Sequence, residues 1–292
     1  MASTKELKTR IGSVEDTMKI TNAMYMIANN KMRKAKKARE ATEPYFETLQ
    51  STLSLAMHHL PDVDHPYFDA RPGIAPANRK TAYLVITGDK GLAGAYHQNI
   101  FKLLEASLAQ TANNQIYVIG QMGVHYLRRR RIPFDVNFMY TAQDPSLGRA
   151  RDIGTRIFDL FREGLIDDVY VIYTRMQNAA TMTAEKFRLL PLDAETMAEP
   201  AEDIKNTFVL YPTPEAVVST VVPDYVVGFV YGALVESYCS EQNARVMAME
   251  NATDSAKDIL ADLKLEYNRV RQANITQEIT EIIGGARAQK GK

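Results

Sequence analysis

The loop from Thr87 to Tyr96 has the residue types from which phosphate-binding sites are made. Its sequence, TGDKGLAGAY, follows an apolar stretch that predicts a strand and opens one that predicts a helix. Phosphate groups bind to backbone N–H groups in such glycine-rich turns. However, the glycines at 88, 91 and 94 do not form G-x-G-x-x-G, and Lys90 is not followed by Ser or Thr as a P-loop requires. The spacing favours a structural turn, and a nucleotide-binding enzyme that uses this loop remains an alternative.

Other groups of reactive side chains are less suggestive. His58, His59 and His65 lie close in sequence, but adjacent side chains point apart and no nearby Cys or Glu completes a metal set. Four arginines, 128–131, precede Pro133. They favour a solvated helix C-terminus, where cations suit the dipole, over a nucleic-acid patch. The chain has no Gly-x-Ser-x-Gly elbow and no plausible acid–base pair. We therefore expect no catalytic residues, metal or cofactor.

Composition narrows the class of protein. The 292 residues include 35 Lys plus Arg and 35 Asp plus Glu, so no net charge draws the chain to nucleic acid or anionic lipid. A single cysteine, Cys239, excludes an internal disulfide. The first residues lack the apolar segment of a secretory signal. The longest apolar run, 225–235, is shorter than the ~20 residues of a membrane span. We therefore expect membrane association only through a partner.

The first secondary-structure element that the sequence predicts is a long N-terminal helix. If residues 5–57 are helical, the helix is roughly 80 Å long. Pro44 is a candidate kink, and Ile20, Met24 and Ile27 form a second apolar row that predicts more than one neighbour. The main apolar row has the 3-4 spacing of a coiled-coil seam. It comprises Ile11, Val14, Met18, Thr21, Tyr25, Ala28, Met32 and Ala35.

A second long helix is predicted at the C-terminus. Residues 233–283 contain neither proline nor glycine, and residues 225–235 are apolar almost all round. The predicted seam, interrupted by Glu266, is Ala252, Ala256, Ile259, Leu263, Val270 and Ala273. Because the middle of the chain must bring its second end back to the first, an antiparallel pair is favoured over two unrelated surface helices.

Between the long helices, short β-branched and aromatic runs alternate with helical ones. The expected strands are 81–87, 115–119 and 169–173, and the expected helices are 95–109, 122–131 and 147–163. This alternation predicts a small Rossmann-like α/β domain with parallel strands. The expected organisation is an N-terminal shaft helix 1–60, a linker 61–79, a central α/β domain 80–193, a linker 194–214 and a C-terminal shaft helix 215–292.

Three stretches carry a family resemblance. The C-terminal stretch fits I-T-x-E-x-x-E-x-x-x-G-A-x-A through Ile275, Thr276, Glu278, Glu281, Gly285, Ala286 and Ala288. Residues 11–28 are similar to I-x-S-V-x-N-T-x-K-I-T-K-A-M-x-M-V-A, with Asn22 in place of the common Lys. Asn29 and Asn30 replace a small Ala-rich pair, and residues 244–254 fit A-R-x-x-A-M-x-x-A-T-D. The chain thereby resembles the gamma subunit of bacterial F-type ATP synthase.

The loop at 87–97 also resembles that family's S-D-K-G-L-C-G-x-Y-N stretch, with Ala93 for Cys and His97 for Asn. The resemblance implies a structural, partner-facing loop there. It further implies a non-catalytic rotor shaft that couples proton- or sodium-driven rotation of the c-subunit ring of Fo to the alpha and beta catalytic ring. The epsilon subunit is a further implied partner.

The implied location is the cytoplasmic face of the bacterial plasma membrane, as a peripheral part of the F1Fo complex. By the family pattern, Met24 and Arg245 lie near the acidic lever of beta, although Met24 also fits plain seam packing. The upper contacts with the ring are assigned to Gln272, Thr276, Glu278 and Glu281. On the residues alone, a coiled-coil scaffold with an α/β head remains a further alternative.

Overall fold

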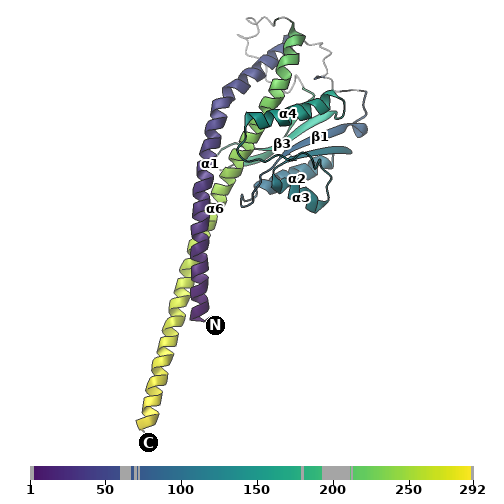
Figure 1. Cartoon of the computed structure of the whole chain (residues 1–292). Coiled ribbons are helices and arrows are strands. Elements are labelled where there is room, and N and C mark those ends of the chain that lie inside the picture. Colours follow the sequence, from purple (N-terminus) through teal and green to yellow (C-terminus); the bar gives the residue numbers. More distant parts are fainter. Residues whose placement is uncertain are drawn as a thin grey trace. The chain divides into compact units, whose positions relative to one another are not determined.

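Two long helices and a four-stranded sheet dominate the described part of the chain (Figure 1). The computed structural model describes residues 3–59, 67–68, 71, 73–178, 181–192, 211 and 213–290. The helices are α1 (Thr4–His59), α2 (Tyr96–Leu108), α3 (Gln121–Arg130), α4 (Leu147–Arg162) and α6 (Pro214–Lys290). The strands are β1 (Lys80–Ile86), β2 (Asn113–Ile119), β3 (Asp168–Met176) and β4 (Met182–Leu190).

The chain forms two compact units. Residues 1–28 and 246–292 make a helical-pair unit, and residues 29–245 make an α/β unit. The first unit is built from the start of α1 and the second half of α6, and the second unit holds the sheet, the short helices and the remaining lengths of α1 and α6.

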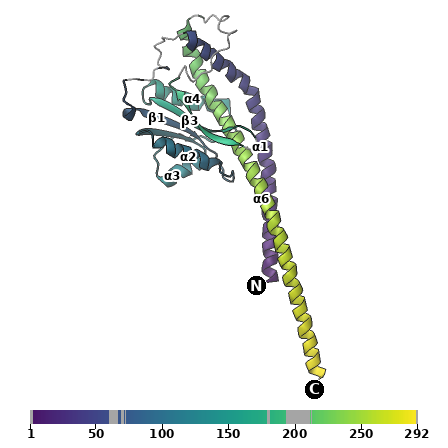
Figure 2. The same cartoon turned by 180° about the vertical axis from the view of Figure 1, so that it is seen from behind.

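The helical-pair unit is antiparallel, as predicted. The hydroxyls of Thr21 and Thr253 are 2.8 Å apart, and the Lys264 ammonium is 3.3 Å from the Glu15 carboxylate. Numbering therefore rises along one helix as it falls along the other, and both views of the pair agree with this direction (Figures 1 and 2). Thr21, Ala28 and Ala256 are buried in the seam between the helices.

The predicted seam on α6 was partly wrong. Ile259 is 51% exposed, and Glu266 and Ala273 are exposed as well. Leu260 and Tyr267 are half-buried in their place, next to the correctly predicted Leu263 and Val270. Both 259 and 260 are apolar, so two seams one residue apart fit the same stretch. Because Glu266 lies outside the seam, it does not interrupt it.

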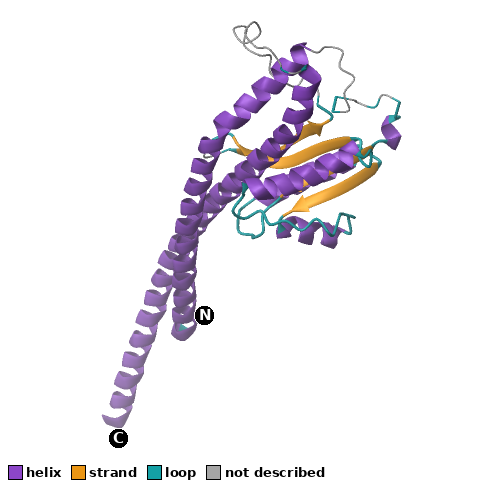
Figure 3. Cartoon of the chain, turned by 45° about the horizontal axis from the view of Figure 1, so that its top comes forward, coloured by secondary structure: helices purple, strands orange, loops and turns teal. Residues whose placement is uncertain are grey.

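The sheet of the α/β unit has the order β2-β1-β3-β4, drawn as orange arrows in Figure 3. Strands β1, β2 and β3 are parallel, as predicted from their apolar runs. Strand β4 is antiparallel to β3 and was not predicted. Its sequence, MTAEKFRLL, carries three charged residues, because an edge strand keeps much of its surface in water. Polar edge strands lack the apolar run by which the other strands were found.

Alternate residues of β1 point into two different cores. Ala82, Leu84 and Ile86 pack with residues of α4 and α6, whereas Tyr83 and Val85 pack with residues of α2 and α3. This alternation follows from the two-residue repeat of a strand. Short helices therefore cover both faces of the sheet, as the prediction of a Rossmann-like layer structure requires.

The first part of α6 is a core helix. Val218, Val222, Val226 and Val230 are fully buried at four-residue spacing, and residues 233–244 are buried without exception. By length and composition, α6 is the one described helix apolar enough to cross a membrane; half of its most apolar window, of mean hydropathy 1.5, is buried within the protein. Burial in the α/β unit accounts for this apolar stretch.

Candidate functional site

The loop after β1 is held from inside by the side chain of Asp89. One carboxylate oxygen accepts the backbone N–H of Gln121 at 3.0 Å, at the start of α3. The other accepts the backbone N–H groups of Ala142 at 2.9 Å and Gln143 at 3.2 Å. The carboxylate therefore occupies N–H groups of the kind that bind phosphate in nucleotide loops, and its charge repels an anion. This arrangement favours the structural turn.

Glycines in and beside this loop allow close packing. A Cβ atom on Gly88 would lie 2.7 Å from Cδ of Glu241 and 2.8 Å from Nε2 of His97. At Gly120, whose φ is +94°, a Cβ atom would lie 2.7 Å from the carbonyl oxygen of Thr87. Neither position accepts a side chain without displacement of its neighbours. The structure thus gives these two glycines a packing role.

Arg245 connects the loop to α6. Its Nη2 donates to Oε1 of Glu241 at 2.5 Å and to the carbonyl oxygens of Lys90 and Gly91, each at 3.1 Å. The Arg245 side chain is 12% exposed and the Glu241 side chain is 4% exposed. We call this group, Arg245 with Glu241 and the two carbonyls, the Arg245 clip. Burial raises the pKa of Glu241, and the Arg245 charge acts against that rise.

His97 lies beside the clip. It is 7% exposed, and its Nε2 has no hydrogen-bond partner among the described residues. Burial, together with the nearby Arg245 charge, lowers the pKa of His97 to about 4. The imidazole is therefore neutral at pH 7. Sequence analysis noted His97 only as a departure from the family pattern and missed Glu241, although the four-residue spacing of Glu241 and Arg245 was a signal for a helix ion pair.

The residues predicted as partner contacts lie in different surroundings. Met24 is half-buried in the helical-pair unit, whereas Arg245 is directed into the α/β unit. Every residue from 271 to 286 is exposed, including Gln272, Thr276, Glu278 and Glu281. The Thr276 hydroxyl donates to the Gln272 carbonyl at 2.9 Å, and Glu281 accepts from Gln277 at 3.0 Å. The end of α6 thus presents an exposed surface on which polar side chains and four isoleucines alternate.

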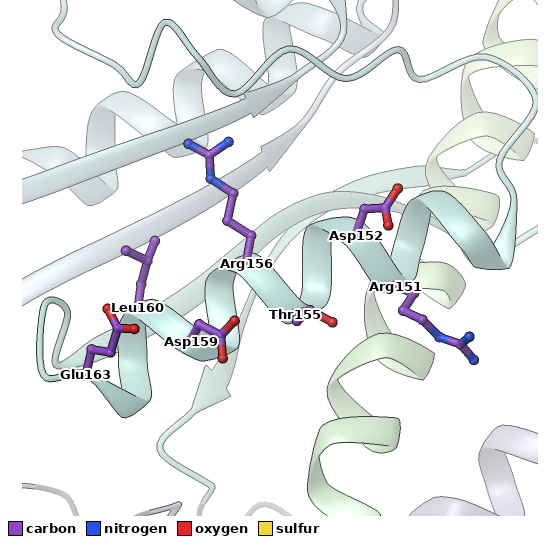
Figure 4. Close-up of a pocket in the computed structure, with 7 residues that line it drawn as sticks. All are labelled: Arg151, Asp152, Thr155, Arg156, Asp159, Leu160 and Glu163. Carbon is purple, nitrogen blue, oxygen red and sulfur yellow. The ribbon is translucent and has the colours of Figure 1, made fainter.

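Two hollows lie among the described residues of the α/β unit. One, of about 590 Å³, is a shallow depression along the outer face of α4. Its side chains spread away from one another along the helix instead of converging (Figure 4). Two of them are paired elsewhere, Arg156 with Asp135 at 2.8 Å and Asp159 with Arg162 at 2.9 Å.

A second hollow, of about 460 Å³, lies between α1, α6 and the β3–β4 edge. Its buried Glu236 is already paired with Arg39 at 3.0 Å. Among the described residues, no three His, Cys, Asp or Glu side chains are grouped to hold a metal. The side chains of His58 and His59, and the whole of His65, lie outside the described residues.

The fold and the site define a class of protein: one with an antiparallel pair of long helices and a small α/β layer structure. The family model described as ATP synthase matches residues 3–289. A protein named ATP synthase gamma chain from Acetivibrio thermocellus is 41% identical, over 99% of this chain and 100% of its own. Another of that name, from Ruminiclostridium cellulolyticum, is 38% identical over 97% and 98%.

A solved structure shares the fold. The match is the rotor of the Euglena gracilis mitochondrial ATP synthase in rotational state 1, with a TM-score of 0.67 at 16% identity. It covers 93% of this chain and 98% of that one. The chain belongs to the ATP synthase gamma chain family, and the resemblance found in its sequence is confirmed.

Proposed function

We propose that this chain is the central rotor shaft of an F-type ATP synthase. In this role it couples ion-driven rotation of the c-subunit ring to ATP synthesis and hydrolysis at the ring of alpha and beta subunits. The observation that carries the proposal is the exposed end of α6, residues 271–286, in a chain of the gamma family. Sixteen consecutive exposed residues of one helix, four of them isoleucines, offer a surface that another subunit can cover.

The proposed role is mechanical. Catalysis and nucleotide binding belong to the beta subunits, and this chain acts as a stiff asymmetric object. Only contacts that differ between two states shift their equilibrium, so each shaft orientation must favour a different beta conformation. The antiparallel pairing of α1 and α6 in the helical-pair unit supplies stiffness that a single helix lacks.

The proposed direct contacts with the ring are Met24, Gln272, Thr276, Glu278 and Glu281. Glu278 and Glu281 are exposed on the last turns of α6, where they can accept charged hydrogen bonds from a partner. Met24 is half-buried and belongs to the same apolar row of α1 as the exposed residues Ile20 and Ile27. A flexible thioether at that place suits a contact that must be made and broken. Arg245 belongs to the same coupling set.

The remaining proposed partners are the epsilon subunit and the c-subunit ring of Fo. The balanced charge of the chain gives no support to nucleic-acid binding. The proposed location is the cytoplasmic face of the bacterial plasma membrane, where the chain is held as a peripheral member of the complex. The proposed functional regions are the shaft helices 1–60 and 215–292 and the central domain 80–193.

A pull-down of the tagged full-length chain from its own cells, followed by identification of the bound subunits, tests the proposal. We expect alpha, beta, epsilon and c subunits in fixed proportion. A coiled-coil scaffold would instead co-purify without beta, and that result would contradict the rotor assignment.

A further inference from the structure

The hollow of about 460 Å³ between α1, α6 and the β3–β4 edge has the size of a site for a small organic molecule. Its walls come from three parts of the α/β unit that are far apart in the sequence. Helix α1 contributes from the range 39–50, strands β3 and β4 from 173–187, and helix α6 from 225–236. A small molecule in this space would therefore contact all three parts at once.

Aromatic rings make up much of the apolar wall of the hollow. Phe187 and Phe229 are stacked with their ring centroids 4.4 Å apart, and Tyr173 is edge-on to Phe229 at 6.0 Å. These three rings and the ring of Phe46 are half-buried, so each keeps part of its surface uncovered. Such rings bind apolar bodies, and their faces attract positive charge.

A glycine in the interior of α6 leaves space in the hollow. Gly228 has a packing reason, because a Cβ atom there would lie 2.4 Å from Cε1 of Phe46. One turn later, Gly232 also lines the hollow, but a Cβ atom on it would meet nothing within 4 Å beyond its own helical turn. Alanine stabilises a helix interior more than glycine does. No neighbour requires glycine at position 232, and the space beside it is open to a ligand.

The charges around the hollow are mostly negative, since four glutamates and two arginines line it. Arg39 is already paired with Glu236 at 3.0 Å and with Glu43 at 3.3 Å. Glu47 is exposed one turn after Glu43 on α1 and has no ion-pair partner among the described residues. Like charges at four-residue spacing repel each other. A cation that reached both carboxylates would remove this repulsion, whereas an anion would add to it.

We propose that this hollow is a binding site for an organic cation, namely an amine with an aromatic body. The body lies against the rings of Phe187 and Phe229 beside Gly232, and the ammonium group reaches Glu43 and Glu47 on the α1 wall. The negative charge of that wall selects against an anion of the same shape. The inference does not depend on the proposed function, because it concerns a site within the α/β unit alone.

Dansylcadaverine is a suitable probe, since it joins a naphthalene body to a primary ammonium group and its fluorescence rises when the body leaves water. Titrated against the purified full-length chain, it should bind saturably at one site, with a dissociation constant on the order of 10 μM. The analogue with a carboxylate in place of the ammonium group is the matched control for charge. It should bind about tenfold more weakly, and equal binding of the two probes would contradict the choice of a cation.

Two sets of variants locate the probe. Gly232→Leu places a side chain in the open space and should weaken binding at least about tenfold without lowering the melting temperature, since leucine favours a helix more than glycine does. Gly284→Leu makes the same change at an exposed position of α6 and should leave binding unchanged. The double variant Glu43→Gln, Glu47→Gln changes only exposed side chains and should weaken dansylcadaverine about fivefold without weakening the carboxylate analogue.

Two results would overturn the inference. The first is the absence of saturable dansylcadaverine binding by the wild-type chain. The second is saturable binding that neither Gly232→Leu nor the double glutamate variant weakens, which would place the probe elsewhere on the chain. Binding is measured on the chain alone, so failure of this site is distinguishable from failure of the rotor assignment, which the pull-down tests.

Discussion

The two units of this chain differ in how they bury apolar side chains. The α/β unit closes two large cores of its own, in which Leu84, Ile86 and Ile100 are fully buried. The helical-pair unit leaves Ile20 at 58%, Leu265 at 71% and Ile282 at 71% exposed. Exposed apolar residues in such numbers mark surfaces that another molecule covers. The comparison teaches that the α/β unit has large cores of its own, whereas much of the apolar surface of the helical pair stays exposed, where we expect partners to cover it.

The most buried charged pairs of the described residues belong to the α/β unit. In the α/β unit, Arg79 is paired with Asp168 at 2.6 Å in a partly buried contact, and the carboxylate side chain is 9% exposed. In the helical-pair unit, Lys19 with Asp16 and Lys257 with Asp254 are pairs within one helix, and all four side chains are more than half exposed. Such surface pairs contribute little to stability. The polar surface of the helical pair therefore stays available for partners.

The largest expected effect lies in the α/β unit and concerns His97. Its pKa of about 4 in the folded protein is below its ordinary value of 6.5, so the unfolded chain takes up a proton first as the pH falls. Stability should therefore fall between about pH 6.5 and pH 4, by about 3 kcal/mol in total. In His97→Asn, urea unfolding followed by tyrosine fluorescence should show a flatter pH dependence.

The raised pKa of Glu241 acts in the opposite direction, because its protonation at low pH stabilises the fold. Glu241 makes this contribution in wild type and in His97→Asn alike. The difference in pH dependence between the two proteins therefore reports His97 alone. His125→Asn, at an exposed histidine on α3, is the control. Equal slopes for wild type and His97→Asn would contradict the burial of a neutral imidazole.

A smaller effect tests the seam of the helical pair. Leu260→Asp introduces a charge into the half-buried seam and should cost about 2 kcal/mol of stability. Ile259→Asp makes the same chemical change one residue away, at an exposed position, and should cost less than about 0.5 kcal/mol. Thermal unfolding of the two variants compares them directly. The reverse order of melting temperatures would restore the seam predicted from the sequence.

The smallest expected effect concerns nucleotide binding. The isolated chain should show no tight binding of Mg-ATP in calorimetric titration, because the Asp89 carboxylate already occupies the N–H groups beside the glycine loop. Micromolar, stoichiometric binding would support the nucleotide-binding alternative. A decrease of such binding in Lys90→Ala would then locate the site.

The elements that could be predicted from the sequence are those whose apolar residues follow a regular spacing because one face is buried. The three parallel strands and both long helices were predicted because their apolar runs and 3-4 spacing follow from one buried face. Strand β4 was missed because Glu185, Lys186 and Arg188 give it the composition of a surface segment. The seam of α6 was placed at Ile259 instead of Leu260 because both neighbouring positions are apolar.

The candidate site was harder to predict, because its contacts join distant parts of the sequence. Gly88 lies against Glu241, and Arg245 bonds the carbonyls at 90 and 91. No local pattern reports such a contact. The loop was singled out for its glycines, and the structure shows that Gly88 lies in close contact with Glu241 and His97. Met24, Gln272, Thr276, Glu278 and Glu281 stay predictions as partner contacts.

Rotation of the helical pair is the central claim, and one cross-link tests it most directly. Lys257 has a side chain 61% exposed in the helical-pair unit, so Lys257→Cys is accessible to an engineered cysteine on the facing beta subunit. Cys239→Ala removes the native thiol, which is buried. A disulfide holds two Cα atoms within about 7 Å, far less than a rotor sweeps in one turn.

Lys257→Cys beside unaltered beta subunits is the control and should keep full turnover under oxidation. Oxidation of the cross-linking pair should stop ATP turnover and ion pumping, and reduction should restore both. Full turnover in a completely cross-linked sample would contradict rotation of the helical pair.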